Sequence, residues 1–325
     1  MSGYRDLESR LRDKQVILLD GAVGTQLQAM KVPMSSHAWA AEALYSHPFT
    51  VRRMHENYIA AGCDVITTNT YASARHNLMP LGQGDLTNEL NLRAVMLAED
   101  ARERAAKERP VWIAGSVSNF GLLIGAERYT DPDFVRYFEF RGEISEKQAR
   151  ANLREQAEIL AEAGVDLLLA EATGSTEQRK WVLEACAATG LPVWAGFKCH
   201  QRPDDPTVRI GYCSEDTLAE TVEDVMAVGG SVLVVFHTFM STTEAALPIV
   251  KELWDGPIGV YPEAEREDYV DTYRDQSAAG PVGPQDFAAF ARRCVDQGVQ
   301  IVGGCCGIEL EHIRPLREAL PTHVG

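Results

Sequence analysis

The chain has 325 residues, 45% of them hydrophobic and 24% charged, a composition that is typical of a packed globular protein and excludes a disordered chain, a collagen and a coiled coil. Its formal charge of −16 repels phosphate backbones and anionic lipids, so we expect neither nucleic acid nor a membrane surface as a partner. No apolar run approaches the roughly 18 residues of a membrane span, and the first residues, MSGYRDLESRLRDK, are too charged for a signal peptide, so we expect a cytoplasmic protein.

Short apolar runs rich in β-branched residues recur along the chain, and most are followed by a longer stretch of helical periodicity. The predicted strands are Val16–Leu19, Val65–Thr68, Val111–Ala114, Leu167–Ala170, Val193–Phe197, Val232–Phe236, Ile258–Tyr261 and Gln300–Val302. The predicted helices are Phe49–Ala61, Asn88–Lys107, Lys147–Ala163, Ser175–Ala188, Ser214–Ala227, Thr243–Leu253 and Pro284–Gln297. This alternation predicts a single α/β domain over residues 1–325, folded as a (β/α)8 TIM barrel. A doubly wound open sheet is the competing fold, but no Gly-x-Gly-x-x-Gly motif follows the first strand.

Chemically versatile side chains follow the predicted strands. In a TIM barrel the carboxyl ends of all strands meet at one rim, which carries the functional groups. The residues expected there include acids, an aromatic residue, a lysine, a histidine and two adjacent cysteines, namely Asp20, Tyr71, Glu171, Lys198, His237, Cys305 and Cys306. The sequence therefore predicts one polar site on this rim.

The most specific local motif is Gly-Gly-Cys-Cys-Gly, which contains Cys305 and Cys306. Adjacent side chains of a strand point to opposite faces, so the flanking glycines would have to turn the backbone for both thiolates to bind one ion. The alternatives are a pair of small buried side chains and a vicinal disulfide. A catalytic zinc needs a third protein ligand, for which His237 is the first candidate. The adjacent Cys199 and His200 are the second.

Five segments together resemble the homocysteine S-methyltransferase family, and the resemblance runs nearly end to end. They are Leu18–Leu27, Asn69–Ser73, Ala114–Ser116, Asp166–Glu171 and Gly303–Gly307. The resemblance implies a zinc-containing TIM barrel that transfers a methyl group to the sulfur of homocysteine, as in methionine biosynthesis. It also implies two small-molecule partners, a thiol acceptor and a methyl donor such as betaine or S-methylmethionine.

The resemblance also implies a ligand set for Zn2+. Family members bind the metal through three cysteines, of which the last two match Cys305 and Cys306. The first cysteine follows an asparagine at the end of the sixth strand, where this chain has Phe236 and His237. The implied metal and catalytic residues are therefore His237, Cys305 and Cys306. Exchanging an anionic cysteine for a neutral histidine makes the metal a stronger Lewis acid and a bound thiolate less nucleophilic, which suits a more reactive donor or a different thiol.

The substrate residues carry over from the family in two groups. Asp20 and Gly21 match the family's segment after the first strand, and Glu171 matches its acid at the end of the fourth strand. In the family, both of these regions hold the amino-acid part of homocysteine. Trp39 and Tyr71 resemble the aromatic donor-site residues of the betaine-using branch, whose rings suit a cation.

One further position departs from the betaine-using branch. That branch has a tyrosine where this chain has Ala172. We therefore expect a wider pocket that favours a sulfonium or a bulkier donor over the compact trimethylammonium of betaine.

Two other functions stay open from the sequence. Lys198 could form a Schiff base with a carbonyl substrate, which would make the protein a lyase. The Phe236–His237 pair is also compatible with a barrel that has lost its metal and acts as a binding or regulatory protein. The long segments Asn119–Glu146 and Glu263–Gly283 are expected to cover the site or to contact a second subunit of a homo-oligomer.

Overall fold

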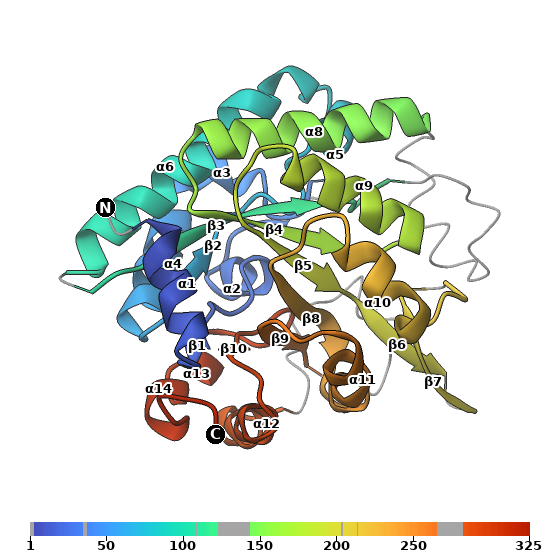
Figure 1. Cartoon of the computed structure of the whole chain (residues 1–325). Coiled ribbons are helices and arrows are strands. Elements are labelled where there is room, and N and C mark those ends of the chain that lie inside the picture. Colours follow the sequence, from blue (N-terminus) through green and yellow to red (C-terminus); the bar gives the residue numbers. More distant parts are fainter. Residues whose placement is uncertain are drawn as a thin grey trace.

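A computed structural model describes residues 3–34, 38–107, 109–122, 144–202, 204–212, 214–264 and 282–325. Eight parallel strands form its central sheet in the order β1-β10-β9-β8-β5-β4-β3-β2 (Figure 1). Their bounds are β1 Ile17–Leu18, β2 Val65–Thr67, β3 Trp112–Ser118, β4 Leu167–Ala172, β5 Val193–Phe197, β8 Val232–Phe239, β9 Ile258–Glu263 and β10 Ile301–Val302. A parallel bridge from Leu19 to Val65 joins β1 to β2, so the sheet closes on itself and the predicted TIM barrel is confirmed.

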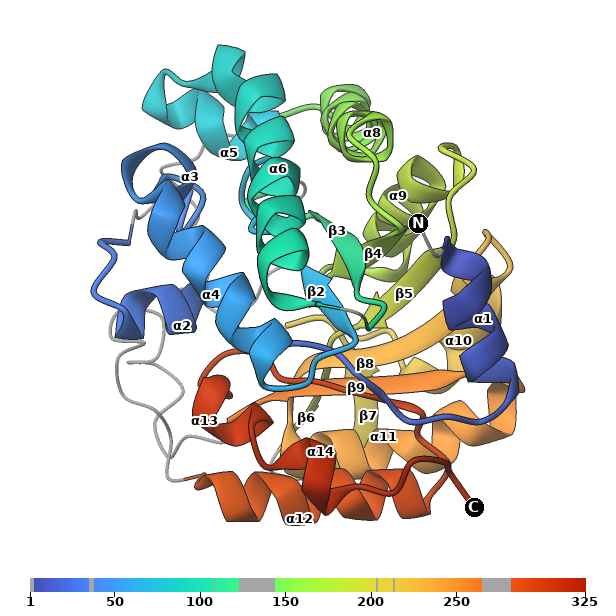
Figure 2. The same ribbon diagram turned by 90° about the vertical axis from the view of Figure 1, so that its left-hand side faces the viewer.

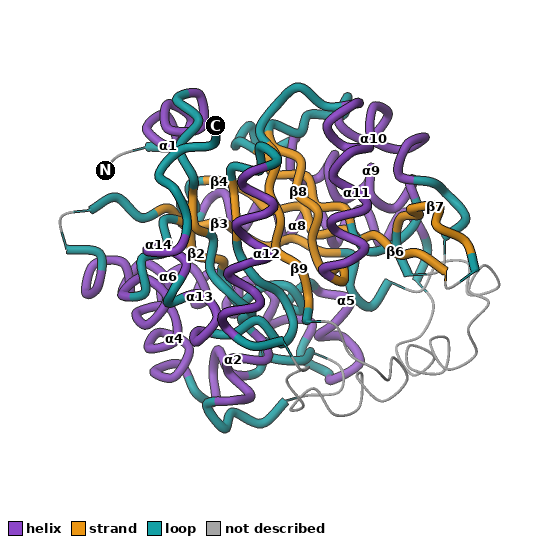
Figure 3. The backbone as a smooth tube through the Cα atoms, turned by 90° about the horizontal axis from the view of Figure 1, so that it is seen from below, coloured by secondary structure: helices purple, strands orange, loops and turns teal. Residues whose placement is uncertain are grey.

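Helices surround the barrel, with α4, α6 and α8 on one side of the strands and α11 and α12 on the other (Figures 2 and 3). The longer helices are α1 Tyr4–Arg12, α4 Pro48–Ala60, α6 Thr87–Ala105, α8 Glu146–Glu162, α9 Thr176–Ala187, α10 Leu218–Met226, α11 Met240–Leu253 and α12 Pro284–Asp296. The short ones are α2 Gly24–Ala29, α3 Ala43–Ser46, α5 Arg75–Leu78, α13 Leu310–Ile313 and α14 Leu316–Ala319, with 3₁₀ turns at Met79–Leu81 and Gly84–Leu86. No helix within the described ranges is long and apolar enough to cross a membrane.

All seven predicted helices are present, with differences at their ends. The largest is in α10, which begins at Leu218 and not near Ser214, because Thr217 caps the helix through a reciprocal pair of hydrogen bonds with Glu220. The structure also has an antiparallel hairpin that the sequence did not predict, formed by β6 (Cys199–Arg202) and β7 (Asp205–Ile210). The hairpin follows β5 in the chain and projects away from the barrel at the lower right of Figure 1.

The core has two layers because successive strand residues face opposite sides. Leu167 and Leu169 of β4 belong to the cluster inside the barrel, whereas Leu168 and Ala170 belong to the cluster between strands and helices. Helix α1 supplies Leu7 to the interior cluster, where it is completely buried. Side chains thus fill the barrel, and the cavity described next lies at the carboxyl ends of the strands.

Candidate active site

An open cavity lies at the rim formed by the carboxyl ends of the strands, and the empty space within it and at its mouth is about 920 Å³. The eight site residues that the family resemblance implied all line it, namely Asp20, Gly21, Trp39, Tyr71, Glu171, His237, Cys305 and Cys306. The cavity lining comes from both ends of the chain and from the strands between them, so barrel closure is what brings these residues together.

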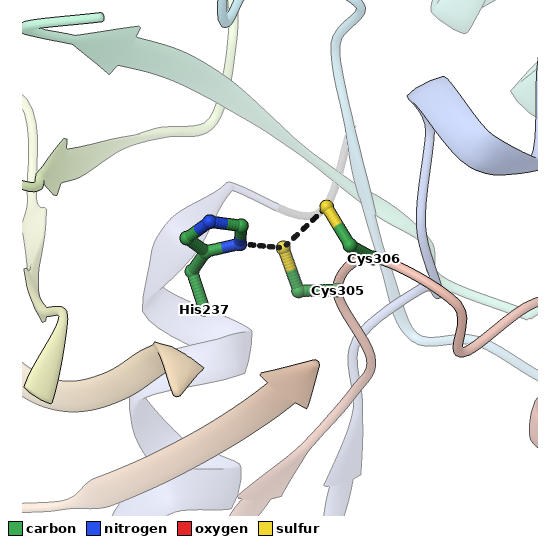
Figure 4. A group of neighbouring side chains, drawn as sticks. All are labelled: His237, Cys305 and Cys306. Carbon is green, nitrogen blue, oxygen red and sulfur yellow. Dashed lines mark hydrogen bonds between the residues drawn. The ribbon is translucent and has the colours of Figure 1, made fainter. Parts of the chain in front are cut away.

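Three side chains at the rim form a group that could hold a metal ion (Figure 4). The Nδ1 atom of His237 lies 3.3 Å from Sγ of Cys305, and the two sulfur atoms of Cys305 and Cys306 are 4.0 Å apart. The three donor atoms lie within 4.8 Å of one another. The hydrogen bond with Cys306 and burial raise the pKa of the Cys305 thiol well above its usual range, so the thiol keeps its proton unless a cation displaces it.

The second candidate pair lies elsewhere. Cys199 is buried, and its sulfur faces the carbonyl of Phe197 at 3.8 Å. The Nδ1 atom of His200 lies 2.8 Å from the carbonyl oxygen of Gly211, within the hairpin. Neither residue lines the cavity or joins the group of possible metal ligands found in the described ranges.

Backbone geometry aims His237 at the rim. Val235 faces the outer core and Phe236 the barrel interior, so regular alternation would turn the next side chain outward. Instead the β8–β9 pairing shifts register between Phe236 and Phe239, and His237 adopts a left-handed φ of +46°. Such a φ is uncommon for a residue with a Cβ and costs on the order of 1 kcal/mol or more. The strained bulge therefore redirects the imidazole towards the cysteines.

Glycines make the cysteine turn possible, as the motif indicated. A Cβ on Gly303 would lie 2.7 Å from the carbonyl oxygen of Asp20, and one on Gly304 only 2.2 Å from Ile308. The turn itself is closed by a hydrogen bond from the Ile308 amide to the Cys305 carbonyl, 2.8 Å long. Larger residues would therefore push the two cysteines out of their present positions.

Two buried carboxyl groups form the polar part of the cavity. Asp20 accepts hydrogen bonds from the amide and hydroxyl of Thr67, at 2.7 and 2.8 Å. Glu171 accepts one from Tyr261 at 3.1 Å and a short one from Ser116. Burial raises the pKa of Asp20 to about 8 and that of Glu171 to about 7, because neither charge is solvated. A bound cation would favour the ionised form of both.

Aromatic rings form much of the remaining wall. The centroid of the Phe120 ring lies 6.1 Å from that of Trp39 and 5.2 Å from that of Tyr71, so these rings support one another. Trp39 has a left-handed φ of +44°, and its indole lies where a Cβ on Gly24 would be only 2.3 Å from Nε1. Gly24 is therefore required for this position of the tryptophan ring.

The expected effect of Ala172 on the pocket is not supported. Ala172 belongs to the core cluster between strands and helices and does not line the cavity. Sequence reasoning also missed four rings that do line it, those of Phe120, Tyr212, Phe236 and Tyr261, as substrate-site residues. Tyr261 could have been found because it ends the seventh predicted strand, whereas the hairpin that precedes Tyr212 carried no recognisable pattern.

Lys198 does not reach the cavity. Its side chain is almost completely buried, and Nζ lies 3.1 Å from the Cys199 carbonyl and 3.8 Å from a carboxylate oxygen of Glu263. A carbonyl substrate in the cavity would not meet this amine, so the geometry does not support a Schiff-base lyase. Of the two long segments expected to cover the site, residues 123–143 and 265–281 lie outside the described residues.

Known proteins resemble the chain over most of its length. Residues 17–320 match the family model described as homocysteine S-methyltransferase. The chain is 26% identical to a selenocysteine methyltransferase of Astragalus bisulcatus, over 94% of this chain and 92% of the relative. It is 25% identical to betaine–homocysteine S-methyltransferase 1 of Bos taurus, over 97% of this chain and 75% of the relative.

Among solved structures, the metallated form of the homocysteine methyltransferase MmuM from Escherichia coli has a similar fold. The TM-score is 0.72 at 23% identity, over 97% of this chain and 99% of the other. This likeness supports the barrel architecture along nearly the whole chain.

The buried carboxyls predict that the free energy of unfolding decreases as pH rises. The unfolded chain loses the Asp20 proton near the usual pKa of 3.8, whereas the folded chain keeps it up to about pH 8. Its contribution to stability is therefore full below about pH 4 and is lost as pH rises through 8. We therefore expect the melting temperature of Asp20→Asn, relative to that of the wild type, to rise by about 3 °C or more between pH 5 and pH 8.5 in ligand-free protein.

The control is Asp296→Asn, which removes an exposed carboxylate paired with Arg292. It should follow the wild-type melting profile at all pH values. Parallel profiles for Asp20→Asn and the wild type would show that Asp20 is ionised in the folded chain at neutral pH.

Proposed function

The chain belongs to the homocysteine S-methyltransferase family and is a methyltransferase, and we propose that it transfers a methyl group from an onium donor, a sulfonium or a betaine-like compound, to the thiol of homocysteine or a related thiol. We further propose that it uses Zn2+ held by His237, Cys305 and Cys306, within a single catalytic domain. The observation that carries the proposal is that these donors, two buried carboxyls and a wall of aromatic rings share one cavity.

The donor set fits zinc. Thiolates and imidazole are preferred ligands of zinc and poor ligands of magnesium and calcium. Zn–S bonds of about 2.3 Å place two sulfurs of a tetrahedral site roughly 3.8 Å apart, which agrees with the 4.0 Å between Cys305 and Cys306. Three protein ligands leave a fourth position open, as catalytic zinc sites do. When bound, the metal lowers the pKa of an acceptor thiol so that the thiol is ionised at neutral pH.

The two carboxyls fit the amino-acid end of the acceptor. Asp20 and Glu171 line the same cavity as the cysteines, and each is held in place by hydrogen bonds from other strands of the barrel. An ammonium group beside them would ionise both and form charge-assisted hydrogen bonds in a site with little water. These residues thus orient the acceptor, while its sulfur points to the cysteine pair.

The aromatic wall fits the donor. Trp39 and Tyr71 present ring surfaces to the cavity, and Phe120 holds both rings in position. A methyl group on positively charged sulfur or nitrogen is attracted to such surfaces and needs no hydrogen-bond acceptor. The protein's contribution to the transfer is then to align the thiolate, methyl carbon and leaving group and to exclude water.

The first prediction concerns the metal. Purified protein should contain about one zinc per chain, and His237→Ala should lose most of it because two ligands bind far more weakly than three. The control is Cys199→Ser, which changes a buried thiol outside the ligand group and should keep its zinc. Elemental analysis after dialysis measures both. If His237→Ala retained its zinc and Cys199→Ser lost it, the proposed set of metal ligands would be wrong.

The second prediction separates acceptor binding from metal binding. Asp20→Asn and Glu171→Gln should each raise the KM for the acceptor about tenfold or more, since a charge-assisted hydrogen bond contributes about 1.5–3 kcal/mol. Zinc content should stay at the wild-type value in both variants. A variant that loses its zinc instead would make that carboxyl part of the metal site.

The third prediction concerns the donor. Trp39→Ala should raise the donor KM up to about thirtyfold, because a desolvated cation on an aromatic face gains about 2 kcal/mol, and should change the acceptor KM far less. Steady-state kinetics with sulfonium and trimethylammonium donors measure both constants. Equal rates with an uncharged methyl donor, or unchanged donor kinetics in Trp39→Ala and Tyr71→Ala, would contradict the cation site.

A further inference from the structure

The β6–β7 hairpin places a tyrosine against the histidine of the metal-binding group. Tyr212 follows β7, and its Oη lies 2.6 Å from Nε2 of His237. The ring centroids are 5.8 Å apart and the planes meet at 78°, so the hydroxyl approaches the edge of the imidazole. The other ring nitrogen, Nδ1, is the one that faces Cys305 (Figure 4). The two nitrogens of His237 thus have different partners on opposite sides.

Several contacts fix the position of this tyrosine. The Gly211 amide donates a hydrogen bond of 2.8 Å to the Lys198 carbonyl, and the Gly211 carbonyl oxygen lies 2.8 Å from Nδ1 of His200. Gly211 has a left-handed φ of +73°, and a Cβ there would lie 2.7 Å from the Gly174 carbonyl. The ammonium of Lys198 lies 5.1 Å from the centroid of the Tyr212 ring. The hairpin is therefore anchored to the barrel at the residue preceding Tyr212.

We propose that Tyr212 is a positioning residue that accepts a hydrogen bond from Nε2 of His237 and so directs the lone pair of Nδ1 towards Cys305 and Cys306. A neutral imidazole has one N–H and one lone pair, so a proton on Nε2 leaves Nδ1 free to bind a metal. Histidine ligands of metals generally donate their second N–H to such a partner. The proposal rests on the metal site of the proposed function and deepens it.

A competing contact explains why such a partner is needed. A carboxylate oxygen of Glu263 lies 3.4 Å from Nδ1 of His237 and favours the opposite tautomer, with the proton on Nδ1. Lys198, 3.8 Å from the other oxygen of Glu263, offsets part of this charge. A cysteine at position 237 would have neither two tautomers nor a ring to orient. Tyr212 therefore fixes the tautomer and the ring orientation of His237, a role that a cysteine at this position would not require.

The test is the zinc affinity of purified Tyr212→Phe, measured by competition with a chelator. Phenylalanine keeps the ring over Lys198 and removes only the hydroxyl, and loss of such a partner typically weakens metal binding by about 10- to 100-fold. The matched control is Tyr261→Phe, which removes a buried hydroxyl bonded to Glu171 in the same cavity and should keep wild-type zinc affinity. The absorption spectrum of the Co2+-substituted proteins should change in Tyr212→Phe only.

A double-mutant cycle distinguishes positioning from a structural role. In the His237→Cys background the ring is absent, so Tyr212→Phe should no longer change zinc affinity. Wild-type affinity and an unchanged Co2+ spectrum in Tyr212→Phe would overturn the proposal, as would an equal loss of affinity in both backgrounds. If the wild-type protein itself binds no zinc, the proposed metal site is wrong, a result separate from failure of the tyrosine alone.

Discussion

Closure of the parallel sheet is the constraint on which the candidate site depends. All eight strands run in the same direction. The residues that follow them meet at one rim only because the contact between β1 and β2 closes the sheet. His237 and Cys305 are 68 positions apart in the chain, yet their donor atoms lie 3.3 Å apart. Neither strand could place these atoms by itself. The register between β8, β9 and β10 sets the distance, and the barrel interior beneath them is packed with side chains that resist a shift.

The site concentrates features that are unfavourable for folding alone. His237 and Trp39 have left-handed backbone conformations, and Asp20 and Glu171 are carboxyl groups buried away from water. Each costs free energy in the empty protein, and each is held by contacts from several strands. A cation in the cavity relieves the electrostatic part of this cost by ionising and pairing the carboxyls. Stability without ligand and affinity for a cationic substrate therefore oppose one another at these two acids.

The histidine at position 237 changes more than one ligand atom. A neutral imidazole replaces an anionic thiolate, so the donor set has one negative charge fewer than the three cysteines implied by the family resemblance. An imidazole also has an orientation and two tautomers, which a thiolate lacks. Tyr212 and Glu263 contact its two nitrogens from different elements, at 2.6 and 3.4 Å. The departure at one residue is thus accompanied by a hairpin and an acid that act on the same ring.

Local periodicity determined most of the architecture. Side chains on one face recur every second residue in a strand and every third or fourth residue in a helix, so the spacing of apolar residues over a short stretch indicates which element forms. Eight short apolar runs, most of them followed by a helical stretch, predicted the strands. The residues after these runs included Asp20, Glu171, His237 and the cysteine pair, which line the cavity, whereas Trp39 was found only through the family resemblance. The glycines around the cysteine pair indicated a turn for the same local reason. Family resemblance then supplied a chemical role for each position.

Tertiary structure decided the contacts that no local pattern encodes. Lys198 and Ala172 both follow predicted strands, but Lys198 is buried beside Glu263 and Ala172 faces the helices, so neither lines the cavity. Tyr212 reaches the site only through the hairpin, whose path depends on hydrogen bonds to the barrel. Which nitrogen of His237 faces the cysteines depends on a backbone bulge and on these neighbours. Such choices follow from packing between distant segments, whose register and orientation the residue pattern along one strand does not specify.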